Sequence, residues 1–219
     1  MHFSEIKALL LKDLLLEWKQ KNSLVGILIY IISTVFLCYF AFKQIISTET
    51  YNALFWIIIL FTGINTVSKS FMQESDERQL YYYQLASPQG IIISKIIYNS
   101  SLMLILTSMA FITYTIFLGN PIQNIVLFAL TAFLGSWGFG TILSLVSAIA
   151  SKTGNNPTIM AILSFPIILP FLDTLIGLSM NSIEGIISPQ NLKFIIVLAS
   201  MNTIVAALSY ILFPYLWRD

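Results

Sequence analysis

One long hydrophilic segment, between Lys69 and Lys95, interrupts an otherwise apolar chain. It carries four charged side chains followed by leucine and tyrosine, and its candidate contact residues are Glu74, Asp76, Glu77, Arg78, Leu80, Tyr81 and Tyr83. Arginine and aromatic side chains are favoured anchors at protein interfaces, and a buried leucine adds affinity. We therefore expect this segment to bind a soluble protein partner. The alternative is a solvated connector whose tyrosines lie at the level of the lipid headgroups.

Residues that could perform covalent or metal chemistry are scarce in this chain. The single histidine, His2, stands at the start, so an HExxH zinc site or a Ser-His pair cannot be assembled within the membrane. No Gly-Lys dipeptide occurs, which excludes a GxxxxGKS/T phosphate-binding loop. We predict no catalytic residue, no metal site and no enzyme activity of its own, so that any ATP hydrolysis belongs to a partner subunit.

The composition indicates an integral membrane protein. Of the 219 residues, 57% are hydrophobic and 10% are charged, and six apolar runs are long enough to cross about 30 Å of hydrocarbon as helices. The net charge of +1 offers no basic field for nucleic acid. The centres of the six runs contain no charged residue and no histidine, which disfavours an ion-coupled carrier. We place the spans at residues 23–42, 51–71, 91–117, 124–150, 157–177 and 192–217.

The connections between these spans favour one orientation. Gly119 and Pro121 forbid a continuous helix and predict a tight hairpin between the third and fourth spans. If both termini are cytoplasmic, Lys43 and Lys193 lie outside and the other nine of the 11 Lys and Arg residues lie inside. The segment 72–90 is then a cytoplasmic loop or short helix, and the segment 173–191 is extracytoplasmic. We expect a multi-pass protein of the bacterial inner membrane, with an organellar inner membrane as the alternative.

Residues 1–21 are predicted to form an amphipathic helix. On a helical wheel the apolar face holds Leu10, Leu11, Leu14, Leu15 and Trp18. The opposite face holds Glu5, Lys12, Asp13, Glu17, Lys19 and Gln20. A helix of this kind lies in the membrane interface. It is either a working elbow helix at the cytoplasmic surface or an anchor that only sets the angle of the first span.

The fourth span carries a packing signal. Small residues recur at every fourth position, namely Ala132, Ser136, Gly140, Ser144 and Ala148. They form a smooth strip on one side of a helix, where another helix can approach closely. The strip is either a sliding interface, between subunits or at a gate, or ordinary packing inside the protomer.

The fifth span carries a possible hinge. Pro166 and Pro170 lie one turn apart, and each removes a backbone donor and crowds the preceding turn. The helix is therefore expected to kink or break there, and the carbonyl groups that lose their donors must find partners inside the protein. A moving hinge and a static bend fit the sequence equally well.

Short motifs along the whole chain resemble one membrane family. The first half contributes Lys12-Asp13-Leu14 with Glu17, Phe71 with Glu74, Gln79-Leu80, Leu85-Ala86-Ser87-Pro88 and Lys95. The second half contributes Leu134-Gly135 with Gly138 and Gly140, then Lys152 and the run 162–170. In this order and at this spacing they resemble the haem exporter protein B family, the CcmB-type permeases of cytochrome c maturation. Residues 77–79 depart from that pattern, in which a glycine precedes the leucine.

The resemblance implies a single transmembrane permease domain over residues 1–219, of the six-span ABC-2 or exporter-like kind. It implies a partner ATPase (CcmA-like) that binds ATP and magnesium and contacts the candidate residues between 74 and 83. Further implied partners are a haem-handling membrane protein (CcmC-like), a small single-span protein (CcmD-like), the haem chaperone (CcmE-like), membrane lipid and a second copy of this chain. The implied activity couples ATP hydrolysis to haem export or to release of the haem-loaded chaperone.

Haem itself is expected to be held by the complex and not by this chain alone. Cys38, Met103, Met109 and the tyrosines have the side-chain chemistry of axial ligands, but packing is the simpler role for each. Two other functions stay open from the sequence: an ABC-2 permease for a lipid-linked glycan or a drug, and a non-transport membrane assembly scaffold.

Overall fold

The computed structural model describes residues 3–19, 21–42, 46–72, 86–151 and 157–218. Within these ranges the chain is helical apart from short connections and contains no strand, which confirms the predicted all-α class. The helices are α1 (Phe3–Lys19), α2 (Lys21–Phe42), α3 (Thr48–Met72), α5 (Pro88–Leu118), α6 (Ile125–Ser151), α7 (Pro157–Ile183) and α8 (Pro189–Arg218).

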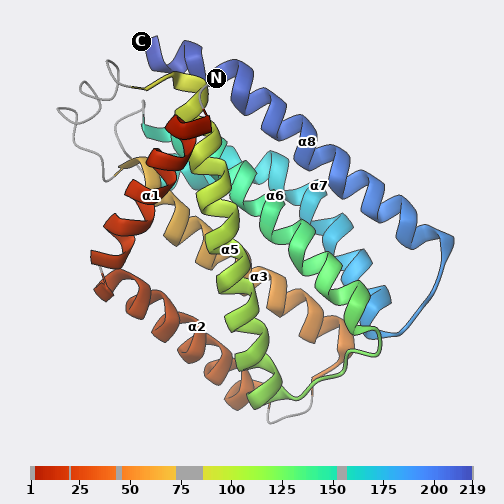
Figure 1. Cartoon of the computed structure of the whole chain (residues 1–219). Helices are drawn as coiled ribbons and strands as arrows, with labels where there is room; N and C mark the ends of the chain where they lie inside the picture. Colours follow the sequence, from red (N-terminus) through yellow and green to blue (C-terminus); the bar gives the residue numbers. More distant parts are fainter. Residues whose placement is uncertain (1–2, 20, 43–45, 73–85, 152–156, 219) are drawn as a thin grey trace.

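Six of the described helices, α2, α3 and α5 to α8, are long and apolar enough to cross a membrane. This confirms the predicted number of spans. The N-terminal segment forms a separate helix of 17 residues, α1, as the sequence predicts. Figure 1 shows the start of α1, the start of α5 and the end of α8 at one end of the molecule, with the α5–α6 hairpin at the other.

Helix α6 lies at the centre of the bundle. It packs against α3, α5, α7 and α8, and nearly every residue from Leu134 to Ala148 is buried. The sequence of α6 is apolar with many small residues, and a helix that is apolar on all sides is stable only when other helices surround it. The other helices are therefore positioned against α6.

The small-residue strip of α6 faces α5 of the same protomer. A Cβ atom added to Gly140 would lie 2.5 Å from the Cα atom of Ser100, so glycine allows the two backbones to approach this closely. One turn earlier, Ser136 Oγ donates a hydrogen bond to Thr107 Oγ1 over 3.0 Å. In hydrocarbon such polar groups have only each other as partners.

Two asparagine side chains form further hydrogen bonds between α6 and its neighbours. Asn99 Nδ2 on α5 donates to Ser144 Oγ over 2.8 Å. From the other side, Asn202 Nδ2 on α8 donates to the Leu134 carbonyl over 3.1 Å. Both asparagines are fully buried. The position of α6 between α5 and α8 is thus fixed by directional hydrogen bonds as well as by packing.

Helix α7 extends further than the sequence indicates. The fifth span is predicted to end at Gly177, yet α7 continues to Ile183. The extra turns are held because Ser179 Oγ donates to Asn52 Oδ1 over 2.5 Å and accepts from Trp56 Nε1 over 2.8 Å. The predicted outer segment 173–191 is therefore mostly helix, and its irregular part is residues 184–188.

The two prolines of α7 do not break the helix. Pro166 and Pro170 both lie inside a single helix, and both side chains are exposed. Of the predicted kink or break, the break is wrong. The carbonyl groups that lose a backbone donor are those of Ile162 and Pro166, four residues before each proline.

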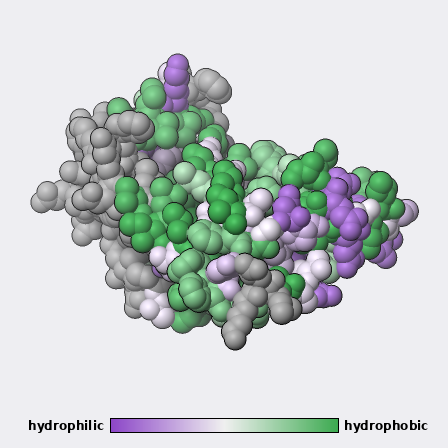
Figure 2. All heavy atoms as spheres, turned by 90° about the horizontal axis from the view of Figure 1, so that it is seen from below, coloured by the Kyte–Doolittle hydropathy of each residue, from purple (hydrophilic) through white to green (hydrophobic). Residues whose placement is uncertain are grey.

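At the end opposite the termini, the connection between α5 and α6 contacts the end of α7. Gly119 has φ of +83°, which favours glycine and turns the chain from α5 toward α6. The Asn124 amide then donates to the Ser182 carbonyl of α7 over 2.9 Å. Figure 2, which views this end, shows hydrophilic residues gathered at one side of a largely hydrophobic face.

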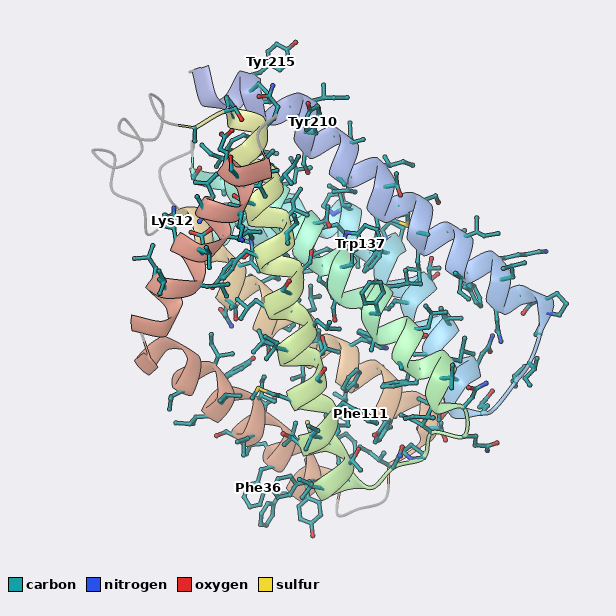
Figure 3. The ribbon with its side chains drawn as sticks, viewed as in Figure 1. Lys12, Phe36, Phe111, Trp137, Tyr210 and Tyr215 are labelled. Atoms are coloured by element: carbon teal, nitrogen blue, oxygen red, sulfur yellow. The ribbon has the colours of Figure 1, made fainter. Side chains whose placement is uncertain are left out.

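Aromatic residues mark both ends of the bundle. Phe36 contacts Phe40 and Phe117 with ring centroids 4.8 Å and 5.6 Å apart, and in Figure 3 it lies at the lower end. Tyr210 and Tyr215 lie on α8 toward the upper end (Figure 3) and are exposed. Aromatic side chains gather at the two membrane interfaces. Tyrosines at one end of the bundle, as on α8, are typical of a helix that ends at a membrane interface.

Replacing Gly140 by alanine is expected to lower the free energy of unfolding by about 1 to 3 kcal/mol, because the added methyl group meets the α5 backbone and not a movable side chain. Gly26→Ala is the matched control, since nothing lies within 4 Å of its Cβ position. Reversible unfolding in mixed micelles measures both variants. Equal unfolding free energies would contradict the close approach of α5 and α6.

Candidate functional site

The predicted partner-binding residues, Glu74, Asp76, Glu77, Arg78, Leu80, Tyr81 and Tyr83, lie outside the described residues. The helices on either side of them are described. Helix α3 ends at Met72 before this segment, and α5 begins at Pro88 after it. The candidate site is therefore built from the start of α5 and the elements that touch it.

The start of α5 is a well-formed helix N-terminus. Ser87 is the N-cap residue, with extended backbone angles of φ −74° and ψ 140°, and its Oγ accepts a hydrogen bond from the Gly90 amide over 3.2 Å. Pro88 occupies the first helical position, where a backbone N–H would have no acceptor within the helix, so the missing N–H of proline costs nothing there. The Ser-Pro pair therefore fixes where α5 begins.

A carboxylate from α1 lies on this N-terminus. Glu5 Oε1 accepts hydrogen bonds from the Ser87 amide over 2.5 Å and from Ser87 Oγ over 3.0 Å. A Cβ atom on Gly90 would be 2.8 Å from the same oxygen, so glycine leaves room for the carboxylate. The negative charge of Glu5 also suits the positive end of the α5 dipole.

A second contact joins the same two helices further along. Lys95 Nζ on α5 is 3.3 Å from Asp13 Oδ1 on α1, and the side chains are only 6% and 5% exposed. Lys12 Nζ is also 3.3 Å from Asp13 Oδ1, but its side chain is 25% exposed. Among the described residues, Asp13 Oδ2 has no hydrogen-bond partner.

These two contacts have the same spacing on both helices. Glu5 and Asp13 are eight residues apart, as are Ser87 and Lys95, which corresponds to about 12 Å of helix rise in each case. Helix α1 therefore runs beside the start of α5 in the same direction. We call the four residues Glu5, Asp13, Ser87 and Lys95 the polar clamp.

The leucines of α1 point away from the clamp. Leu11, Leu14 and Leu15 are 50%, 56% and 61% exposed, whereas Asp13 is buried. Leu11, Leu14 and Leu15 therefore form an exposed face, as the helical wheel predicts, but Leu10 of the predicted apolar face packs against the hydrophobic core. The side chains of Glu17, Trp18, Lys19 and Gln20 lie outside the described residues. The placement of α1 in the membrane interface stays a prediction, which the exposed leucines favour.

An apolar layer lies beside the clamp. It consists of the buried residues Ile91, Ile92, Ile96, Ala148 and Phe213, with Leu9, Ala86 and Ile93 packed against them. These residues come from α1, α5, α6 and α8 and from the segment just before α5. The layer keeps water from the ion pair, which strengthens the attraction between its charges and makes separation of the charges costly.

With this geometry established, the chain can be compared with known proteins. The family model described as CcmB protein matches residues 4–215, nearly the whole chain and all four clamp residues. The chain belongs to the CcmB family. It is therefore a multi-pass membrane subunit of the haem exporter type in cytochrome c maturation, and it is a transporter subunit. No curated protein and no solved structure matches it.

In this CcmB chain two of the candidate haem ligands, Met103 and Cys38, are packing residues, whereas Met109 is exposed on α5. Met103 is fully buried, and its Cε atom would be 2.9 Å from a Cβ atom on Gly63. Cys38 is half-buried against the hydrophobic core. Within the described ranges, no group of three or more His, Cys, Asp and Glu side chains could hold a metal ion.

A groove of about 280 Å³ lies between α5 and α6 of the CcmB chain. Phe133 and Trp137 of α6 form part of its wall, and Figure 3 labels Trp137 beside α6. The three serine hydroxyls in its lining, those of Ser100, Ser101 and Ser136, each donate to another protein atom. The groove therefore presents an apolar surface, which suits hydrocarbon better than a charged cargo.

Sequence reasoning named Asp13 on the polar face of the N-terminal helix and Lys95 at the end of the hydrophilic segment, and both as parts of a family motif, but it did not pair them. It named Glu5 only as one polar residue on a face, and it missed Gly90. The Ser-Pro signal for a helix start is visible in the sequence, and so is the shared spacing of eight residues. Neither signal says that α1 and α5 are neighbours, because that is a tertiary relation.

Lys95→Met alone is expected to lower the free energy of unfolding by about 3 to 5 kcal/mol, because it leaves the Asp13 carboxylate buried without its α5 partner. Asp13→Leu combined with Lys95→Met should recover most of the loss, since apolar groups can replace a buried ion pair. Lys193→Met, at an exposed position of α8, is the control. A double variant no more stable than Lys95→Met would contradict the pairing.

Proposed function

We propose that this chain is the permease subunit that couples ATP hydrolysis by a separate ATPase subunit to haem export or to release of a haem-loaded chaperone. The CcmB family membership supports the haem-related cargo. The observation that carries the coupling role is the polar clamp, which fixes the start of α5 to α1. In the sequence, the segment 73–85 leads directly to this start of α5.

In this proposal a displacement of the segment 73–85 reaches the centre of the bundle through α5. Lys95 joins α5 to α1, while Asn99 and Thr107 join it to Ser144 and Ser136 on α6. A push at the start of α5 is therefore passed to α6 by directional contacts as well as by packing. Helix α6 in turn contacts α3, α7 and α8.

The proposed partners divide the chemistry among them. The CcmA-like ATPase binds ATP and magnesium and contacts Glu74, Asp76, Glu77, Arg78, Leu80, Tyr81 and Tyr83. CcmC-like, CcmD-like and CcmE-like proteins, with a second copy of this chain, complete the complex and supply the haem ligands. The complex lies in the bacterial inner membrane with both termini of this chain in the cytoplasm. The packing role of Met103 supports the assignment of haem binding to the partners.

Charge reversal in the segment 73–85 tests this function. Glu74→Lys with Glu77→Lys is expected to abolish co-purification of the ATPase and stimulation of its turnover, because repulsion replaces attraction at the contact. Glu184→Lys, exposed beyond the end of α7, is the matched control and should change neither. Normal assembly and ATPase activity in the double variant would overturn the assigned contact. Purification from the native membrane without any ATPase would overturn the function.

A further inference from the structure

We propose that Asp13 and Lys95 are positioning residues of the transport cycle, which make α1 and the first part of α5 move as one rigid body. The inference rests on the proposed coupling function and adds to it a mechanical part that includes the interfacial helix. In this arrangement the movement of the segment 73–85 is delivered to α5 and α1 together. In this proposal α1 moves with α5 during the transport cycle and does more than anchor the chain.

Two contacts at separate points restrain α1 more than one contact does. A single contact at Ser87 would let α1 pivot about the end of α5. The second contact, at Lys95, lies eight residues further along and removes this freedom. The apolar layer of Leu9, Ile93 and Phe213 fills the space beside the clamp and opposes rotation of α1 about its own axis.

The buried ion pair also makes opening of the clamp unfavourable. Asp13 and Lys95 are both about 95% buried, so separating them removes an attraction that is strong in an apolar layer. Lys12, the other cation beside Asp13 Oδ1, lies on α1 itself and does not join the two helices. A movement that keeps the pair together therefore costs less than one that parts it.

The exposed leucines of α1 restrict the direction in which α1 and the start of α5 can move together. Leu11, Leu14 and Leu15 are exposed on the side away from the bundle, where a membrane supplies an apolar environment. Movement along the membrane plane keeps these leucines in that environment, whereas movement out of the plane brings them into water. The start of α5 is therefore guided along the membrane surface.

The test measures haem-loaded chaperone released per ATP hydrolysed by the whole complex in lipid vesicles. Asp13→Asn and Lys95→Gln are each expected to lower this ratio at least about fivefold, while the KM for ATP and the amount of bound ATPase stay unchanged. Lys95→Arg keeps the charge and should preserve the ratio, and the exchange Asp13→Lys with Lys95→Asp should restore most of it. Asp173→Asn and Lys193→Gln, both exposed near the opposite end, are the matched controls.

A cross-link provides a second measurement that does not depend on weakening the fold. Leu9→Cys and Ile93→Cys, in a Cys38→Ser background, place two thiols in the same apolar layer for a short bifunctional reagent. Because α1 and α5 are expected to move together, the cross-linked complex should keep its ratio of release to hydrolysis. Loss of that ratio on cross-linking would overturn the proposal, because it would show that the helices must separate.

An unchanged ratio in Asp13→Asn and Lys95→Gln would also overturn the rigid body, although the proposed coupling function would stand. Failure of that function has a different signature, because the ATPase would then be missing from the purified complex or would hydrolyse ATP without releasing chaperone in the unaltered chain. The two failures are therefore distinguishable in one preparation.

Discussion

The fold depends on one constraint, which is that hydrocarbon offers polar groups no partner. Every buried hydroxyl and amide in the spans has to be accommodated by another helix or by its own backbone. Ser136 and Ser144 on α6 form hydrogen bonds with Thr107 and Asn99 on α5. On the other side of α6, Asn202 of α8 donates a hydrogen bond to the Leu134 carbonyl. Packing alone would hold six apolar helices loosely, since lipid is as apolar as their surfaces. The hydrogen bonds on α6 therefore fix which helices are neighbours and at what height they meet.

At the end that the charge distribution predicts to be cytoplasmic, the same constraint acts on charges. Asp13 and Lys95 are buried, and a buried ion pair adds little net stability compared with an apolar pair of similar size. Its value lies in specificity, because only one register of α1 on α5 brings both Glu5 to Ser87 and Asp13 to Lys95. In this member of the haem exporter family, two helices thus meet in one defined register at the start of α5.

Hydropathy predicts the six spans because each span is long and lacks charges, and Gly119 predicts the α5–α6 hairpin because a turn needs its backbone freedom. The extension of α7 to Ile183 is not predictable in this way, since it depends on the contact of Ser179 with Asn52 and Trp56, far away in the sequence. The prolines of α7 do not break the helix, because the turns on either side of them keep their backbone hydrogen bonds. The wheel of α1 predicts the exposed leucines, but it cannot show that Glu5 and Asp13 meet α5, because one sequence carries no information on which helices touch.

Both contacts of the polar clamp join residues that are 82 positions apart. During synthesis α1 therefore emerges long before its partner, and α2 and α3 must be made before α5 exists. Throughout that interval the carboxylates of Glu5 and Asp13 remain hydrated, and the exposed leucines are the part of α1 that can bind the helix to the membrane. The first helix of the chain can therefore dock only after the start of α5 has formed.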